Sequence, residues 1–106
     1  MRVNDYELEV FTPPCEPGAE RHSAVAHLSI SIAEVLPYLN AALARANYMP
    51  SAKALTWKRA GHLVAFHDDR VAISNLADRE EAVNELDRMI DLVNRTWDRR
   101  SEITPD

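Results

Sequence analysis

The segment from Ser51 to Leu76 constrains the fold more than any other part of the chain. Two turn signals, Ala60-Gly61 and Asp68-Asp69, divide it into three short runs that are rich in apolar residues. Such dipeptides between alternating runs are typical of tight hairpin connections. The segment therefore predicts a three-stranded antiparallel meander.

The register of this meander follows if both turns are two-residue loops. The large apolar side chains of all three strands then fall on one face, which we expect to be the core face. A slip of one residue would scatter them over both faces. The predicted pairs are Leu55 with Phe66, Trp57 with Val64, Arg59 with His62, Phe66 with Val71, and Val64 with Ile73.

The opposite face of the predicted meander differs from an ordinary solvated surface, because many of its side chains are small or weakly polar. Docking surfaces of proteins are partly apolar and poor in charge at their centre. We therefore expect this face to bind a protein partner or a second copy of the chain. Its residues are Ala54, Thr56, Lys58, Leu63, Ala65, His67, Arg70 and Ala72.

Two more strands are predicted before the meander. Residues Tyr6 to Thr12 alternate between apolar and acidic side chains, which is the period of a strand with one wet face. Residues Ser23 to Leu28 can form a second strand beside it. Between them, the proline-rich segment 13–22 is expected to be a stiff loop, since proline has no N–H for a ladder.

Two helices complete the prediction. Apolar spacing and a capping box of Ser31 and Glu34 indicate a helix from Ser31 to Ala46, with Pro37 forcing a kink or a start nearer Val35. A last helix opens at Asp78. Its expected apolar stripe, supported by Ala82 and Met89, is Val83, Leu86, Ile90, Val93 and Trp97.

These elements define an α+β chain with the order ββαβββα. We expect a two-layer sandwich in which both helices cover the Trp57 and Phe66 face of an antiparallel sheet, a shape that resembles TATA-binding-protein-like folds. With 106 residues, 46% of them hydrophobic, the chain is sized for a single domain, 1–106.

Charge and motif content narrow the classes of function. The net charge of -5 disfavours nucleic-acid and anionic-membrane partners, and no apolar run reaches the roughly 20 residues of a membrane span, so a cytoplasmic location is expected. No nucleophile elbow, phosphate-binding loop, H-E-x-x-H or dinucleotide fingerprint occurs. The sequence thus gives no ground for an enzyme.

One weaker pattern points to a metal. Cys15, His22 and His27 form C-x6-H-x4-H and could offer three ligands, although this spacing matches no structural zinc pattern and the ordinary interpretation is a loop thiol with surface histidines. A small-ligand or metal-binding module, or a thiol enzyme using Cys15 with a histidine, stays open as an alternative. His67 with Lys58, Arg70 and Thr56 could also bind an anion, the ordinary interpretation being a charged fringe on a solvated sheet. We expect no cofactor to be held by this chain alone.

Beyond these patterns, the chain resembles the N-terminal region of a family of anaerobe iron-sulfur cluster domain proteins. The resemblance covers nearly all of the sequence. The segments that carry it are YELEVFTPPCEPGAERHSAVAHLS (Tyr6 to Ser29), VLPYLN (Val35 to Asn40), LTWK (Leu55 to Lys58), AFH (Ala65 to His67), SNL (Ser74 to Leu76), DREEA (Asp78 to Ala82), LVNRTW (Leu92 to Trp97) and EITP (Glu102 to Pro105).

The resemblance implies a context and no catalytic residue. In that family the region is followed by a four-cysteine module that binds a [4Fe-4S] cluster, similar to the module in the corrinoid subunit of acetyl-CoA decarbonylase/synthase. The chain ends at Asp106, where that module would begin, so we expect part of a longer protein or a stand-alone relative. The expected function is an accessory domain that docks an iron-sulfur module or redox protein in anaerobic electron transfer or corrinoid and one-carbon metabolism.

Overall fold

The computed structural model describes residues 2–12 and 22–105. Those residues form a six-stranded sheet, two α-helices and three short 3-10 turns. In chain order the elements are β1 Tyr6–Thr12, β2 His22–Leu28, η1 Ala33–Val35, α1 Leu36–Ala42, β3 Asn47–Met49, η2 Pro50–Ala52, β4 Ala54–Arg59, β5 His62–Phe66, β6 Arg70–Leu76, α2 Arg79–Asp98 and η3 Arg100–Glu102.

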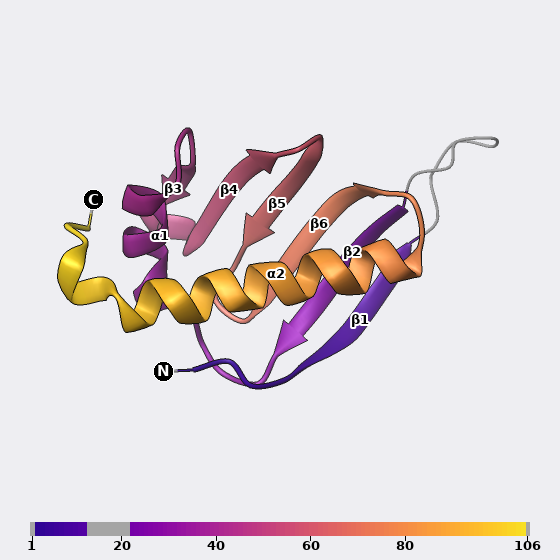
Figure 1. Ribbon diagram of the computed structural model, residues 1–106, viewed down its shortest axis with the longest axis horizontal. Coiled ribbons are helices and arrows are strands. Elements are labelled where there is room, and N and C mark those ends of the chain that lie inside the picture. The colour runs from indigo at the N-terminus through magenta and orange to yellow at the C-terminus, as the bar shows by residue number, and fades with distance from the viewer. Residues whose placement is uncertain (1, 13–21, 106) are drawn as a thin grey trace.

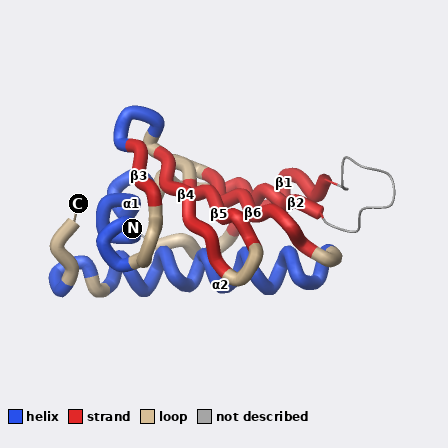
Figure 2. The backbone as a smooth tube through the Cα atoms, turned by 90° about the horizontal axis from the view of Figure 1, so that it is seen from above, coloured by secondary structure: helices blue, strands red, loops and turns tan. Residues whose placement is uncertain are grey.

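The sheet is antiparallel, with the strand order β1-β2-β6-β5-β4-β3. The long helix α2 runs across one face and contacts β6 and β2, whereas α1 packs between α2 and the strands β3 and β4 (Figure 1). Figure 2 shows the strands as one layer with α2 along one side of it. The predicted α+β class, with an antiparallel sheet and two helices, is confirmed. The predicted order ββαβββα is wrong because it omits β3, and the TATA-binding-protein-like shape stays a prediction.

The register predicted for the meander is confirmed at every pair. Leu55 lies opposite Phe66, Trp57 opposite Val64, and Val64 opposite Ile73. Ala60 and Gly61 both have positive φ, at 49° and 84°. Positive φ at both central residues is typical of a two-residue hairpin turn whose twist matches that of the flanking strands. Five of the six predicted core side chains are at most 2% exposed, and Trp57 is half-buried against the core.

The helix α2 begins where the sequence predicts. The Asp78 side chain accepts a hydrogen bond from the Glu81 backbone N–H at 2.8 Å, and the Glu81 carboxylate in turn accepts from the Ala77 N–H at 3.0 Å. The buried face of α2 is formed by Ala82, Leu86, Met89, Ile90 and Val93. The predicted stripe was therefore wrong at Val83, which is 36% exposed, whereas Trp97 is half-buried and packs against the core.

The helix α1 is shorter than predicted. It begins at Leu36, one residue before Pro37, as expected for a proline that cannot sit in a helix interior. The capping box of Ser31 and Glu34 does not open it; Ser31 instead hydrogen-bonds the Asp68 side chain and accepts from the Ala33 N–H. The helix ends at Ala42 because Leu43 is extended, so the predicted end at Ala46 was wrong.

The N-terminal segment is clamped along α2. Val3 and Asn94 exchange two hydrogen bonds, each 2.8 Å long, and the Tyr6 hydroxyl donates to the Asp87 carboxylate at 2.7 Å. Partial burial, that hydrogen bond and the nearby negative charge raise the pKa of Tyr6 well above its usual range. These contacts fix the edge strand β1 against the helix layer.

Two further observations concern the predicted loop and the membrane question. His22 is the first residue of β2, so the predicted loop 13–22 ends at least one residue earlier, and residues 13–21 lie outside the described residues. Across residues 2–12 and 22–105, no helix combines the length and the apolar character that a bilayer crossing requires.

Candidate functional site

The face of the sheet turned away from α2 is the candidate site, which we call the open face. Its centre is a row of small side chains that crosses four strands. Val25 of β2 pairs with Ala72 of β6, Ala72 pairs with Ala65 of β5, and Ala65 pairs with Thr56 of β4. All four are partly exposed. Because neighbouring side chains on one face lie about 5 Å apart, they form a continuous flat strip.

A polar row borders this strip on one side. It consists of Glu7 of β1, His27 of β2 and Arg70 of β6, which are successive cross-strand neighbours, and of His67 next to Arg70. The His67 N–H donates to the Arg70 carbonyl at 2.8 Å. All four residues are exposed. The row therefore places one imidazole, from His27 or His67, on each side of the Arg70 guanidinium.

The other border contains the most exposed apolar residue of the face. Leu63 of β5 is 47% exposed and pairs with Lys58 of β4. Its backbone N–H donates to the Ser74 hydroxyl of β6 at 3.2 Å. A large apolar side chain beside a strip of small ones, with charge kept to the borders, is the composition expected of a docking surface.

The prediction for Ala54 was wrong, because this residue is only 3% exposed. Ala54 pairs with Met49 of β3, and the turn η2 connects the two strands at that point. The unpredicted strand β3 and the turn η2 thus adjoin Ala54 at this corner of the open face. The other predicted residues are partly or fully exposed on that face: Thr56, Lys58, Leu63, Ala65, His67, Arg70 and Ala72.

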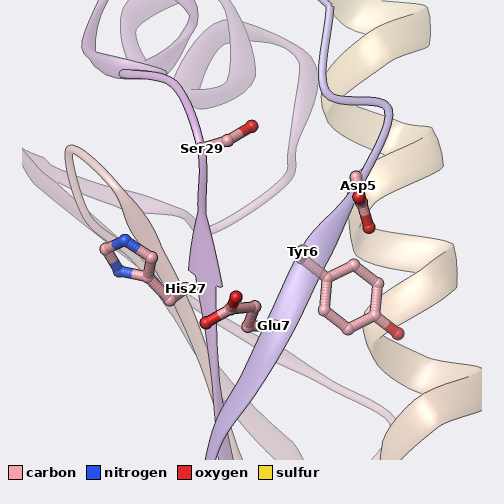
Figure 3. Close-up of a pocket in the computed structure, with 5 residues that line it drawn as sticks. All are labelled: Asp5, Tyr6, Glu7, His27 and Ser29. Carbon is pink, nitrogen blue, oxygen red and sulfur yellow. The ribbon is translucent and has the colours of Figure 1, made fainter.

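A shallow hollow of about 320 Å³ lies at the β1 and β2 end of the sheet. It is lined by Asp5, Tyr6, Glu7, His27 and Ser29 (Figure 3). Figure 3 shows the Tyr6 ring directed toward α2, whereas Glu7 and His27 lie on the other side of their strands. The hollow therefore extends the polar border of the open face past His27.

The predicted metal ligands are not brought together. His22 and His27 are five residues apart on β2, an odd separation that sends them to opposite faces of the sheet. Cys15 lies outside the described residues. Among the residues that the structure describes, no group of three or more His, Cys, Asp or Glu side chains is placed to hold a metal ion.

Sequence reasoning missed the contribution of β2 to the open face. Val25 and His27 continue the small and polar rows of the meander onto this strand, because β2 pairs directly with β6. Alternation within Ser23 to Leu28 was a signal for the exposed side of β2, but nothing local indicated that β6 would be its neighbour. The candidate surface is therefore wider than the meander alone.

In the part of the chain that the structure describes, the fold is α+β, with one sheet face covered by helices and the other face left open. Comparisons with protein-family models, curated proteins and solved structures found no match.

Proposed function

We propose that this chain is a non-catalytic docking domain whose open face binds a protein partner. The observation that carries the proposal is the flat row Val25, Ala72, Ala65 and Thr56, beside exposed Leu63 and bordered by charge. A row of small side chains lets another backbone or helix approach closely. Charged borders then set the orientation of the partner, because they stay solvated at the rim.

The proposed partner is the four-cysteine [4Fe-4S] module of the iron-sulfur family that the sequence resembles, in anaerobic electron transfer or corrinoid and one-carbon metabolism. In this role the chain supplies a surface and the module supplies the redox chemistry. The support for this partner is the resemblance of the segments quoted above, whereas the support for docking is the composition of the open face.

The experiment is a titration of the 15N-labelled chain with the reconstituted four-cysteine module of a family member under anaerobic conditions. We expect amide signals of Leu63, Ala65 and Ala72 to shift on binding. The variant Leu63→Asp should weaken binding by at least about tenfold, since it places a charge in an apolar contact. Sedimentation velocity of the chain alone records its own association state.

The matched control is Val83→Asp, which adds the same charge at an exposed apolar residue on α2. This variant should bind as the unaltered chain does. Shifts confined to α2, or equal weakening by both variants, would reject the open face as the docking surface. If the chain alone forms dimers that Leu63→Asp dissociates, the occupant of the face is a second copy and the iron-sulfur partner is rejected.

A further inference from the structure

A groove lies on the other side of the molecule, where α2 leaves part of β4 uncovered. Two hollows, of about 180 and 230 Å³, sit on either side of Leu92 and Arg95 and share both residues as lining. The first is closed by Trp57 and Arg59 of β4, and the second by the end of α1 and by Ile103. The two hollows adjoin along these shared residues, and we call the pair the arginine groove.

The floor of the arginine groove is apolar. It contains Leu43, Trp57, Leu92 and Ile103, all of which are half-buried and so keep part of their surface open. Three of them, Leu43, Trp57 and Leu92, pack against the main core from its edge. Because the core supports these side chains from below, they offer firm anchor sites to an apolar group from outside.

The rim of the groove is basic, although the whole chain has a net charge of -5. Arg88, Leu92 and Arg95 follow the spacing of a single face of α2. Arg99 is the residue just after the end of this helix, and Arg59 belongs to β4. Asp91 pairs with Arg95 and Glu102 pairs with Arg99, both at exposed positions where such pairs are weak.

Two guanidinium groups share one carboxylate at the β4 end of the groove. There the buried Glu85 carboxylate accepts hydrogen bonds from both Arg59, at 2.8 Å, and Arg88, at 2.9 Å. A single carboxylate thus neutralises only one of two guanidinium groups. It also orients both of them, so their remaining N–H donors are available to a further acceptor in a defined place.

We propose that the arginine groove binds an acidic segment of a partner protein, with apolar anchor side chains on Trp57 and Leu92 and carboxylates on the arginine rim. Charge complementarity favours this occupant, because carboxylates form bidentate pairs with guanidinium groups. The exposed ion pairs of Asp91 and Glu102 with their arginines are weak, so breaking them to bind a partner carboxylate loses little free energy. This surface is separate from the open face and does not depend on its function.

The test begins with a phage-displayed library of 12-residue peptides, selected on the whole chain at low ionic strength. We expect enrichment of peptides that combine Asp or Glu with Leu, Phe or Trp. Fluorescein-labelled copies are then titrated by fluorescence polarisation. The double variant Arg95→Gln/Arg99→Gln should weaken their binding by at least about tenfold, and the indole N–H signal of Trp57 should shift on binding.

Two controls separate this surface from others. The double variant Arg70→Gln/Arg79→Gln makes the same change in net charge away from the groove and should leave binding unchanged. Leu63→Asp alters only the open face and should also have no effect. The proposal is overturned if the selection enriches no peptide, or if the enriched peptides are not rich in Asp and Glu. It is also overturned if the peptides bind Arg95→Gln/Arg99→Gln as tightly as the unaltered chain, or if Leu63→Asp abolishes their binding.

Discussion

Asn94→Ala should strongly lower the free energy of unfolding, because one side chain makes two buried hydrogen bonds to the N-terminal segment. Asn94 accepts from the Val3 N–H and donates to the Val3 carbonyl, and Asn94 and Val3 are 8% and 3% exposed. The alanine variant leaves both Val3 backbone groups without these partners. Since each buried group that loses its partner costs about 1–3 kcal/mol, we expect the free energy of unfolding to fall by about 3 kcal/mol.

Urea denaturation followed by circular dichroism measures this change, against a total stability of about 5–15 kcal/mol for a chain of this kind. Asp98→Ala is the matched control, because it removes the exposed ion pair of Arg2 with Asp98 on the same helix, and it should cost less than about 0.5 kcal/mol. The amide of Val3 should also exchange faster in Asn94→Ala. A loss below about 1 kcal/mol, at an unchanged m value, would refute the clamp as a main support of β1.

Three further predictions follow from the same structure. Because the pKa of Tyr6 is raised in the folded chain, the protonated Tyr6 stabilises the fold fully below its ordinary pKa of about 10, and this stabilisation is lost as the pH rises further. Tyr6→Phe should therefore reduce the fall of the free energy of unfolding with pH in alkaline urea titrations. An unchanged slope would contradict this prediction. Glu85→Gln should cost about 1–2 kcal/mol in thermal and urea unfolding. Arg59 and Arg88 then lose the negative charge and one of the two acceptor oxygens, but both stay partly solvated. Ala60→Asn should stabilise the chain by about 0.5 kcal/mol, since asparagine tolerates the positive φ of 49° better than alanine, and a lower melting temperature would speak against the turn geometry.

The meander could be predicted from the sequence because its information is local. Alternation of side chains fixes which face is buried, and the turn residues fix how the strands pair. The open face followed from the same register, which is why Leu63, Ala65 and Ala72 were placed correctly. Only Ala54 is buried where exposure was predicted, and the elements beside it, β3 and η2, were not predicted.

The strand β3 and the end of α1 could not be predicted for a tertiary reason. Apolar spacing continues past Ala42, so the helix pattern alone gives no stop. The chain nevertheless leaves the helix at Leu43 and adopts positive φ at Arg45, so that Asn47 to Met49 can pair with β4. Three residues without alternation carry no strand signal of their own.

The arginine groove was missed because it depends on where α2 crosses the sheet. Trp57 was assigned to the core from its place in the register, and the register was right. The helix, however, contacts β6 and β2, and so leaves Trp57 half-buried. Spacing along α2 shows that Arg88 and Arg95 share a face, but it does not show what lies opposite them.

The position of β2 between β1 and β6 has a consequence for synthesis on the ribosome. When β2 emerges, only its partner β1 has been made, and the strand that completes its ladder is more than 40 residues away in the sequence. The hydrogen bonds between Val3 and Asn94 can form only later, after the last helix has been synthesised. A nascent chain halted before β6 should therefore be unable to close its sheet, and would present unpaired strand edges to chaperones.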